Sequence, residues 1–126
     1  MRPDAGLGAH LWDMCQSLRM VSRYVDGREQ AELRTDSMLE DAVVRRLTIV
    51  GEAAARIDAE FRSAHPEIPW RKIVGLRNVV THQYDRINLE EIWTVATQDV
   101  PGVLAQLEPL LDAEERRVSE SDVENS

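Results

Sequence analysis

Residues Trp70 to Arg86 (WRKIVGLRNVVTHQYDR) contain the side chains of this chain best suited to chemistry. The charged residues of this segment are Arg71, Lys72, Arg77, Asp85 and Arg86. Four basic groups thus oppose one acid, in a protein whose formal net charge is −8. His82 is the only one of the three histidines that is set among basic and polar neighbours. The pattern predicts a small basic site within an acidic protein.

The pair Arg77 and His82 suits cleavage of a phosphodiester without a metal ion. A guanidinium can hold two phosphate oxygens in a fork and stabilise charge that builds on phosphorus. An imidazole titrates near neutral pH, so it can take a proton from a ribose 2′-hydroxyl or give one to the leaving 5′-oxygen. Tyr84 adds a hydroxyl that could hydrogen-bond the phosphate or be modified itself. RNA is therefore the candidate substrate.

The spacing of these residues leaves their arrangement open. Arg77 and His82 lie about 140° apart around an ideal helix. They converge only if the Arg77 side chain bends round, if the helix unwinds near His82, or if two copies of the chain pool their residues. Asn78 shares a helix face with His82 and could orient it or contact phosphate. A helix-end histidine that caps carbonyls, and an arginine paired with Asp85 or Glu91, would have the same spacing.

The segments around this site are predicted to be helices. Apolar residues recur at helical spacing from Leu7 to Val25, from Leu39 to Phe61 and from Leu89 to Leu110. Trp70 to about His82 is predicted to form a shorter helix after Pro69. No stretch alternates apolar and polar residues as a strand would. The predicted fold is therefore an all-α antiparallel bundle of four main helices.

A few residues predict where these helices begin, break or cross. Thr35-Asp36-Ser37 offers candidate caps for the second helix, and Ser37 and Glu40 have the spacing of a capping box. Pro101-Gly102 predicts a kink or break in the last helix. Gly51 lies inside the second helix at a cost of about 1 kcal/mol relative to alanine, which a close helix–helix crossing would explain. Residues 28–34 are interpreted as a polar connector. The domain is expected to span residues 1–111, followed by an acidic, flexible tail over 112–126.

Composition excludes several classes of protein. The chain of 126 residues allows one compact domain, and its acidic balance argues against coating DNA by bulk charge. Cys15 is the only cysteine, so no disulfide within the chain is expected and a reducing cytoplasm is the default. Met1-Arg2-Pro3-Asp4 does not open a signal peptide, and no apolar run is long enough for a membrane span. No group of residues has metal-ligand spacing, so no cofactor is predicted.

Four blocks, taken in order, resemble those of a known family. Arg77-x4-His82-x-Tyr84 resembles the R-x4-6-H signature of HEPN ribonucleases, and more narrowly that of the HepT toxins. The supporting blocks are Asp41-Ala42-Val43-x-Arg45, Val50-Gly51-Glu52-Ala53 and Ile68-Pro69-Trp70. The likeness extends from about Leu11 to Leu111.

This resemblance implies a helical homodimer whose interface joins two R-x4-H motifs into one cleft. It also implies metal-independent RNA cleavage by Arg77 and His82, with tRNA among the candidate substrates, in a type VII-like toxin–antitoxin pair. The antitoxin would be a minimal nucleotidyltransferase that silences the toxin by transferring AMP to Tyr84. In such a cleft, Glu52 could orient Arg77. The alternative is a non-catalytic helical partner that only presents Tyr84 to the nucleotidyltransferase.

The remaining aromatic and sulfur-containing residues are assigned structural roles. Trp12, Trp70 and Trp93 each fall within a helical apolar pattern, so they are expected to anchor the core or a dimer interface. Cys15 is expected to be an inert, buried thiol.

Overall fold

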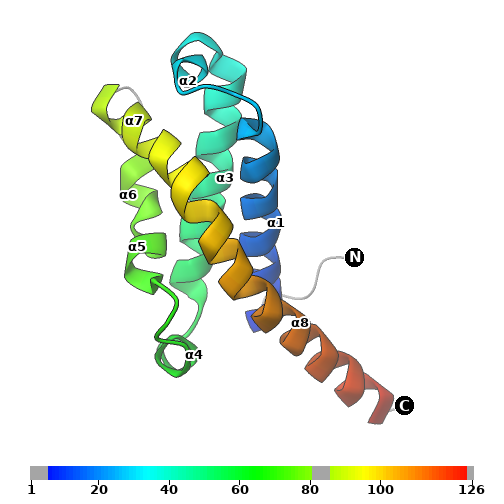
Figure 1. Cartoon of the computed structure of the whole chain (residues 1–126). Coiled ribbons are helices and arrows are strands. Elements are labelled where there is room, and N and C mark those ends of the chain that lie inside the picture. The colour runs from blue at the N-terminus through cyan, green and yellow to red at the C-terminus, as the bar shows by residue number, and fades with distance from the viewer. Residues whose placement is uncertain (1–5, 81–85, 125–126) are drawn as a thin grey trace.

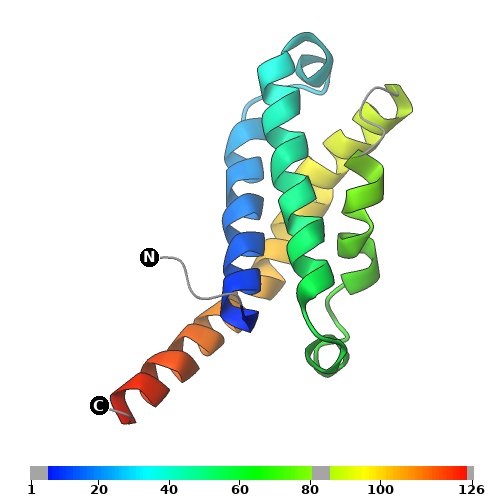
Figure 2. The ribbon, with the colours of Figure 1, turned by 180° about the vertical axis from the view of Figure 1, so that it is seen from behind.

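Two long antiparallel helices, α1 (Leu7–Val25) and α3 (Ser37–Arg56), lie side by side in the bundle (Figures 1 and 2). The computed structural model describes residues 6–80 and 86–124. Every regular element in those two ranges is helical, which confirms the predicted all-α class. The remaining elements are α2 (Ala31–Thr35), α4 (Ala59–Ala64), α5 (Trp70–Val74), α6 (Leu76–Val80), α7 (Arg86–Thr94), the π-helical turn η1 (Val95–Asp99) and α8 (Val100–Glu124).

The elements after α3 build two further rods of the bundle. Helices α5 and α6 follow one another beside α3, and α7, η1 and α8 form one continuous rod that crosses α1 (Figure 1). Together with α1 and α3 they make the four main rods of the predicted bundle. Short helices α2 and α4 lie at opposite ends (Figure 1). Side chains that are almost wholly buried fill the space between the rods, among them Leu11, Met14, Leu18, Val43, Leu47, Val50, Ile57, Ile92, Val100 and Leu107.

The helix predicted to continue through Phe61 is in fact two helices. α3 ends at Arg56, and Asp58 begins α4 by accepting the backbone N–H of Phe61 at 2.8 Å. Ile57, between the two helices, is only 2% exposed. The apolar spacing thus continues across the break, which is why periodicity alone predicted one helix.

The predicted kink at Pro101-Gly102 is wrong in its position. Both residues lie inside the regular helix α8, and the irregular turn is η1, directly before it. Here the N–H of Val100 donates to the carbonyl of Val95, a π-type bond that widens the turn. Pro101 has no backbone N–H, so the helix also lacks the hydrogen bond that this residue would donate toward the preceding turn. The widened turn lies where this bond is missing.

Two other predicted boundaries differ from the structure. Of the three candidate caps of α3, Asp36 is the one used: its carboxylate accepts the N–H of Leu39 at 3.1 Å, so Ser37 is already the first helical residue and does not cap the helix. The expected connector at 28–34 contains the start of α2, which buries Leu33. Helix α8 continues through the acidic segment to Glu124, although Leu111 is the last buried residue over 100–122, where burial is described. Flexibility of that segment stays a prediction.

Candidate active site

Arg77 packs directly on Gly51, which fixes where helix α6 crosses α3. A Cβ atom at Gly51 would lie 2.8 Å from Cγ of Arg77 and 3.1 Å from its backbone nitrogen. It would also lie 3.4 Å from the carbonyl oxygen of Ile73. Only a residue without a side chain permits this approach. The close crossing predicted from Gly51 is therefore confirmed, and the residue that it accommodates is Arg77.

The guanidinium end of Arg77 is left available to a ligand. The residue is exposed, and no acidic side chain in the described part of the chain forms an ion pair with it. A pair with Glu91, one of the structural alternatives for this arginine, is thus not formed. The stem is held on Gly51 while the charged fork reaches solvent, an arrangement suited to binding a phosphate.

Asn78 follows Arg77 on α6 and is also exposed. Its backbone N–H donates to the carbonyl of Gly75 at 2.9 Å, which begins the short helix α6. Gly75 separates α5 from α6, but its φ of −61° and ψ of −16° are helical, so the two helices keep almost one axis. The third helix is therefore a pair of short helices with a shared face.

His82 and Tyr84 lie outside the described residues, as does Asp85. Helix α6 is described as far as Val80, two residues before His82. The proposed roles of His82 and Tyr84 stay predictions.

Glu52 lies on a different side of α3 from Arg77. It lines a polar hollow of about 350 Å³ between α1 and α3, and the charged residues around it are Asp13, Arg45, Arg46 and Arg56. Trp12 lines the same hollow. In the described part of the chain, Glu52 forms no hydrogen bond with Arg77. The role of Glu52 in orienting that arginine stays a prediction.

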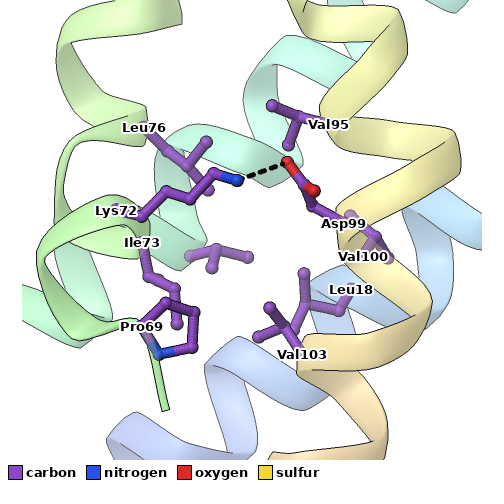
Figure 3. Close-up of a pocket in the computed structure, with 10 residues that line it drawn as sticks. Leu18, Pro69, Lys72, Ile73, Leu76, Val95, Asp99, Val100 and Val103 are labelled. Carbon is purple, nitrogen blue, oxygen red and sulfur yellow. Dashed lines mark ion pairs between the residues drawn. The ribbon is translucent and has the colours of Figure 1, made fainter. Parts of the chain in front are cut away.

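The charge of Lys72, one of the basic residues of the site segment, is paired with an acid that sequence analysis did not find. Its Nζ lies 3.2 Å from the carboxylate of Asp99 in η1 (Figure 3). The two side chains meet beside a small cavity of about 30 Å³, whose lining includes Leu18, Ile73, Val95 and Val103 (Figure 3). The pair joins α5 to the π-helical turn, so the site helix is held by Gly51 on one side and by η1 on another. No local pattern in the sequence links residues so far apart.

An aromatic cluster fixes the start of α5. Trp70 is 8% exposed, and its indole N–H donates to the carbonyl oxygen of His65 at 2.9 Å. The ring of Phe61 lies between, with centroids 4.6 Å from His65 and 6.2 Å from Trp70. Trp70 is therefore a core anchor, as predicted. Trp12 and Trp93 are partly buried against the same core.

Cys15 is a buried structural thiol, as predicted. Its residue has no exposed surface, and burial raises the pKa of the thiol to about 11. A thiol with so high a pKa is protonated at neutral pH and does not act as a nucleophile.

Two negative findings apply to the described residues alone. Within 6–80 and 86–124, no three His, Cys, Asp or Glu side chains are placed to hold a metal ion together. In the same ranges, no helix has both the length and the apolar character needed to cross a bilayer.

The family model and the relatives that match this chain all carry ribonuclease names. Residues 14–110 match the ribonuclease HepT-like family. The protein named "Putative RNase MJ1380" of Methanocaldococcus jannaschii is 34% identical over 100 residues, which cover 79% of this chain and 92% of that protein. "Putative RNase TTE0752" of Caldanaerobacter subterraneus subsp. tengcongensis is 30% identical over 105 residues, covering 83% and 94%. "Probable ribonuclease HepT" of Thermococcus cleftensis is 28% identical over 101 residues, covering 80% and 92%. No solved structure matches the chain significantly.

The all-α bundle, with an exposed arginine held on its third rod, has the architecture of a HEPN protein. The family match covers most of the chain, and the relatives are matched over nine-tenths of their own length. The chain belongs to the ribonuclease HepT-like family of the HEPN superfamily.

Proposed function

We propose that this protein is a metal-independent endoribonuclease whose active site contains Arg77 and His82. The observation that carries the proposal is the placement of Arg77, whose stem rests on Gly51 and whose charged end pairs with no described acid. Membership of a ribonuclease family and the names of the relatives support RNA as the substrate.

The proposed reaction needs only side chains and the substrate. His82 takes the proton of a ribose 2′-hydroxyl, and the 2′-oxygen attacks the adjacent phosphorus. The bond from phosphorus to the 5′-oxygen breaks, and that oxygen receives a proton from an imidazolium. The products are a 2′,3′-cyclic phosphate and a 5′-hydroxyl. Arg77 holds the phosphate oxygens and stabilises the charge that accumulates on them.

A homodimer would bring the two roles together. Arg77 and His82 lie about 140° apart around an ideal helix, so one copy alone does not readily direct both at one phosphate. A two-fold dimer would place two copies of each residue around one groove, and one imidazole could act as base while the other acts as acid. Asn78, one residue after Arg77 on α6, is proposed to face the same groove.

We further propose that the protein is the toxin of a toxin–antitoxin pair and that its partner is a minimal nucleotidyltransferase. In this scheme the Tyr84 oxygen attacks the α-phosphorus of ATP, a Tyr–O–P bond forms and pyrophosphate leaves. The added phosphate would compete for the guanidinium of Arg77, and the nucleoside would fill the groove. Silencing would then need no refolding.

Product analysis tests the proposed chemistry. Purified protein with EDTA should cut single-stranded RNA and leave 2′,3′-cyclic phosphate ends, detected by mass spectrometry. DNA of the same sequence should survive, because it lacks the 2′-hydroxyl. Cleavage that requires Mg²⁺, or products with 3′-hydroxyl ends, would contradict the mechanism. A dimer that accepts AMP on Tyr84 but cuts no RNA would favour the non-catalytic alternative.

A further inference from the structure

The hollow between α4 and α5 is a second basic feature, distinct from the Arg77 site. It has a volume of about 510 Å³ and is lined by Ala59, Arg62, Ser63, Trp70, Arg71 and Val74. Two arginines thus line it, and no acid does. The polar hollow between α1 and α3 differs, because it contains Asp13 and Glu52 among its arginines.

Neither arginine of this hollow forms an ion pair with an acidic side chain of the described residues. Among the described residues, no carboxylate lies within ion-pair distance of Arg62 or Arg71. Glu60, two residues before Arg62 on α4, forms no ion pair with it, and Asp58, the cap of α4, accepts the N–H of Phe61. The Nε of Arg62 is buried and has no hydrogen-bond acceptor in the described part of the chain. A buried N–H without an acceptor is unusual in a folded protein, because leaving it unpaired costs stability.

The chemistry of the hollow selects a phosphate rather than a base. Trp70 could stack on a base only with an open ring face, but its residue is 8% exposed and its indole N–H is bonded to His65. The groups left to a ligand are the guanidinium ends of Arg62 and Arg71 and the hydroxyl of Ser63. All of them can donate hydrogen bonds to phosphate oxygens.

The hollow lies on a helix face that leads to Asn78, the neighbour of Arg77, whereas Arg77 itself lies about 120° from Arg71 around the helix. Arg71, Val74 and Asn78 follow one another at spacings of three and four residues, and the helical backbone at Gly75 keeps this face continuous. From Arg71 to Arg77 the rise along the helix is about 9 Å. A single RNA strand held at Arg77 reaches the hollow if it curves round the helix past Asn78, which would place a phosphate near the scissile one beside Arg71.

We propose that Arg62 and Arg71 form a subsite for a backbone phosphate of the substrate RNA, outside the bond that is cut. This inference rests on the proposed ribonuclease function and adds to it a substrate class. The class is single-stranded RNA long enough to run from the Arg77 site along α5 to α4. Recognition at this subsite is of the backbone and carries no base preference.

RNA binding tests the subsite directly. Fluorescence anisotropy should be measured with a labelled single-stranded RNA oligonucleotide and with a dinucleotide, in EDTA, on protein carrying His82→Ala so that the RNA stays intact. Adding Arg71→Gln or Arg62→Gln should weaken binding of the oligonucleotide by roughly tenfold. The slope of log affinity against log salt should fall by about 0.7 for each arginine. The dinucleotide is too short to reach the hollow, so its affinity should not change.

Matched variants separate this effect from general charge or folding. Arg116→Gln removes the same charge from an exposed position far along α8 and should bind RNA as tightly as its parent. Arg71→Lys restores the charge and should recover part of the affinity. Arg71 is exposed, so Arg71→Gln should melt at the parent temperature even if Arg62→Gln disturbs α4.

The outcomes distinguish the subsite from the proposed function. If the unmodified protein cuts RNA but Arg62→Gln and Arg71→Gln leave oligonucleotide affinity unchanged, the subsite is wrong and the ribonuclease proposal stands. If these variants change the oligomeric state by light scattering instead of RNA affinity, the hollow is a contact between chains and the subsite is again wrong. If the unmodified protein neither binds nor cuts RNA, both proposals fail.

Discussion

Gly51 and Arg77 are in direct contact across two helices, with only the absence of a side chain at Gly51 making room for the stem of Arg77. The Cγ of Arg77 lies 2.8 Å from where a Cβ of residue 51 would be. A glycine inside a helix is normally a cost to stability. Here the glycine has a compensating role, because it lets Arg77 of the candidate active site lie directly against α3.

Gly51→Ala should therefore impair RNA cleavage more than it impairs folding. The added methyl must displace Arg77 or separate α6 from α3, and a displacement of about 1 Å can reduce the rate by roughly 100-fold. Activity and thermal unfolding should be measured together. Gly102→Ala is the matched control, because a Cβ there meets nothing within 4 Å. It should raise stability by up to about 1 kcal/mol and leave cleavage unchanged. Full activity in Gly51→Ala would show that this contact does not position Arg77.

The protein should be a dimer in solution. If α6 continues as an ideal helix, two copies direct Arg77 and His82 at one phosphate more readily than one copy does, and both copies of His82 should face one groove. Light scattering at micromolar concentration should give twice the chain mass of 14.3 kDa. A monomer at that concentration would count strongly against a shared site.

Sequence analysis found the helical class, the four rods and the close crossing at Gly51, because each has a local signal. It did not find the break at Ile57–Asp58, since Ala54, Ile57 and Phe61 keep helical spacing through it. It placed the irregular turn of the last rod at Pro101 instead of Val95–Asp99, because the proline shows the missing donor but not which turn widens to compensate.

Within the candidate site, the sequence identified Arg77 but could not show its neighbours. The contact with Gly51 and the ion pair between Lys72 and Asp99 join segments that are far apart in the chain. Lys72 was counted as part of the basic segment, although its charge is paired with Asp99. Nothing in the sequence marks Arg62 as a candidate binding residue, because only the fold places it beside Arg71.

Cys15 should be unreactive in the folded protein. Burial raises the pKa of its thiol from 9.0 to about 11, so a thiol reagent at pH 8 should label it only after unfolding. The raised pKa also predicts a pH dependence. Between pH 9 and 11 the unfolded chain loses this proton and the folded chain keeps it, so stability should fall as pH rises. The melting temperature measured across that window should fall less steeply in Cys15→Ala. Equal slopes would contradict the assignment.

Tyr84 should be the site of regulation. Co-expression with the cognate nucleotidyltransferase should add one or more AMP units, mapped to Tyr84 by peptide mass spectrometry, and the product should be inactive on RNA. Tyr84→Phe should keep at least part of the cleavage activity and escape silencing. Tyr24→Phe is the matched control. Tyr24 packs against the core, so this substitution should leave the labelling of Tyr84 intact. If Tyr84→Phe is labelled and silenced as fully as the unmodified protein, the proposed regulation is wrong.

The most direct test of the ribonuclease proposal is the rate of RNA cleavage in EDTA by the unmodified protein, His82→Ala and Arg77→Lys. Loss of a proton-transfer group typically costs about 10²–10⁴ in rate, so His82→Ala should fall close to background. Arg77→Lys should also fail, because an ammonium cannot reproduce the two-pronged contact with phosphate. His10→Gln, in α1, should cut RNA at the unmodified rate. Cleavage that persists in His82→Ala would contradict the account.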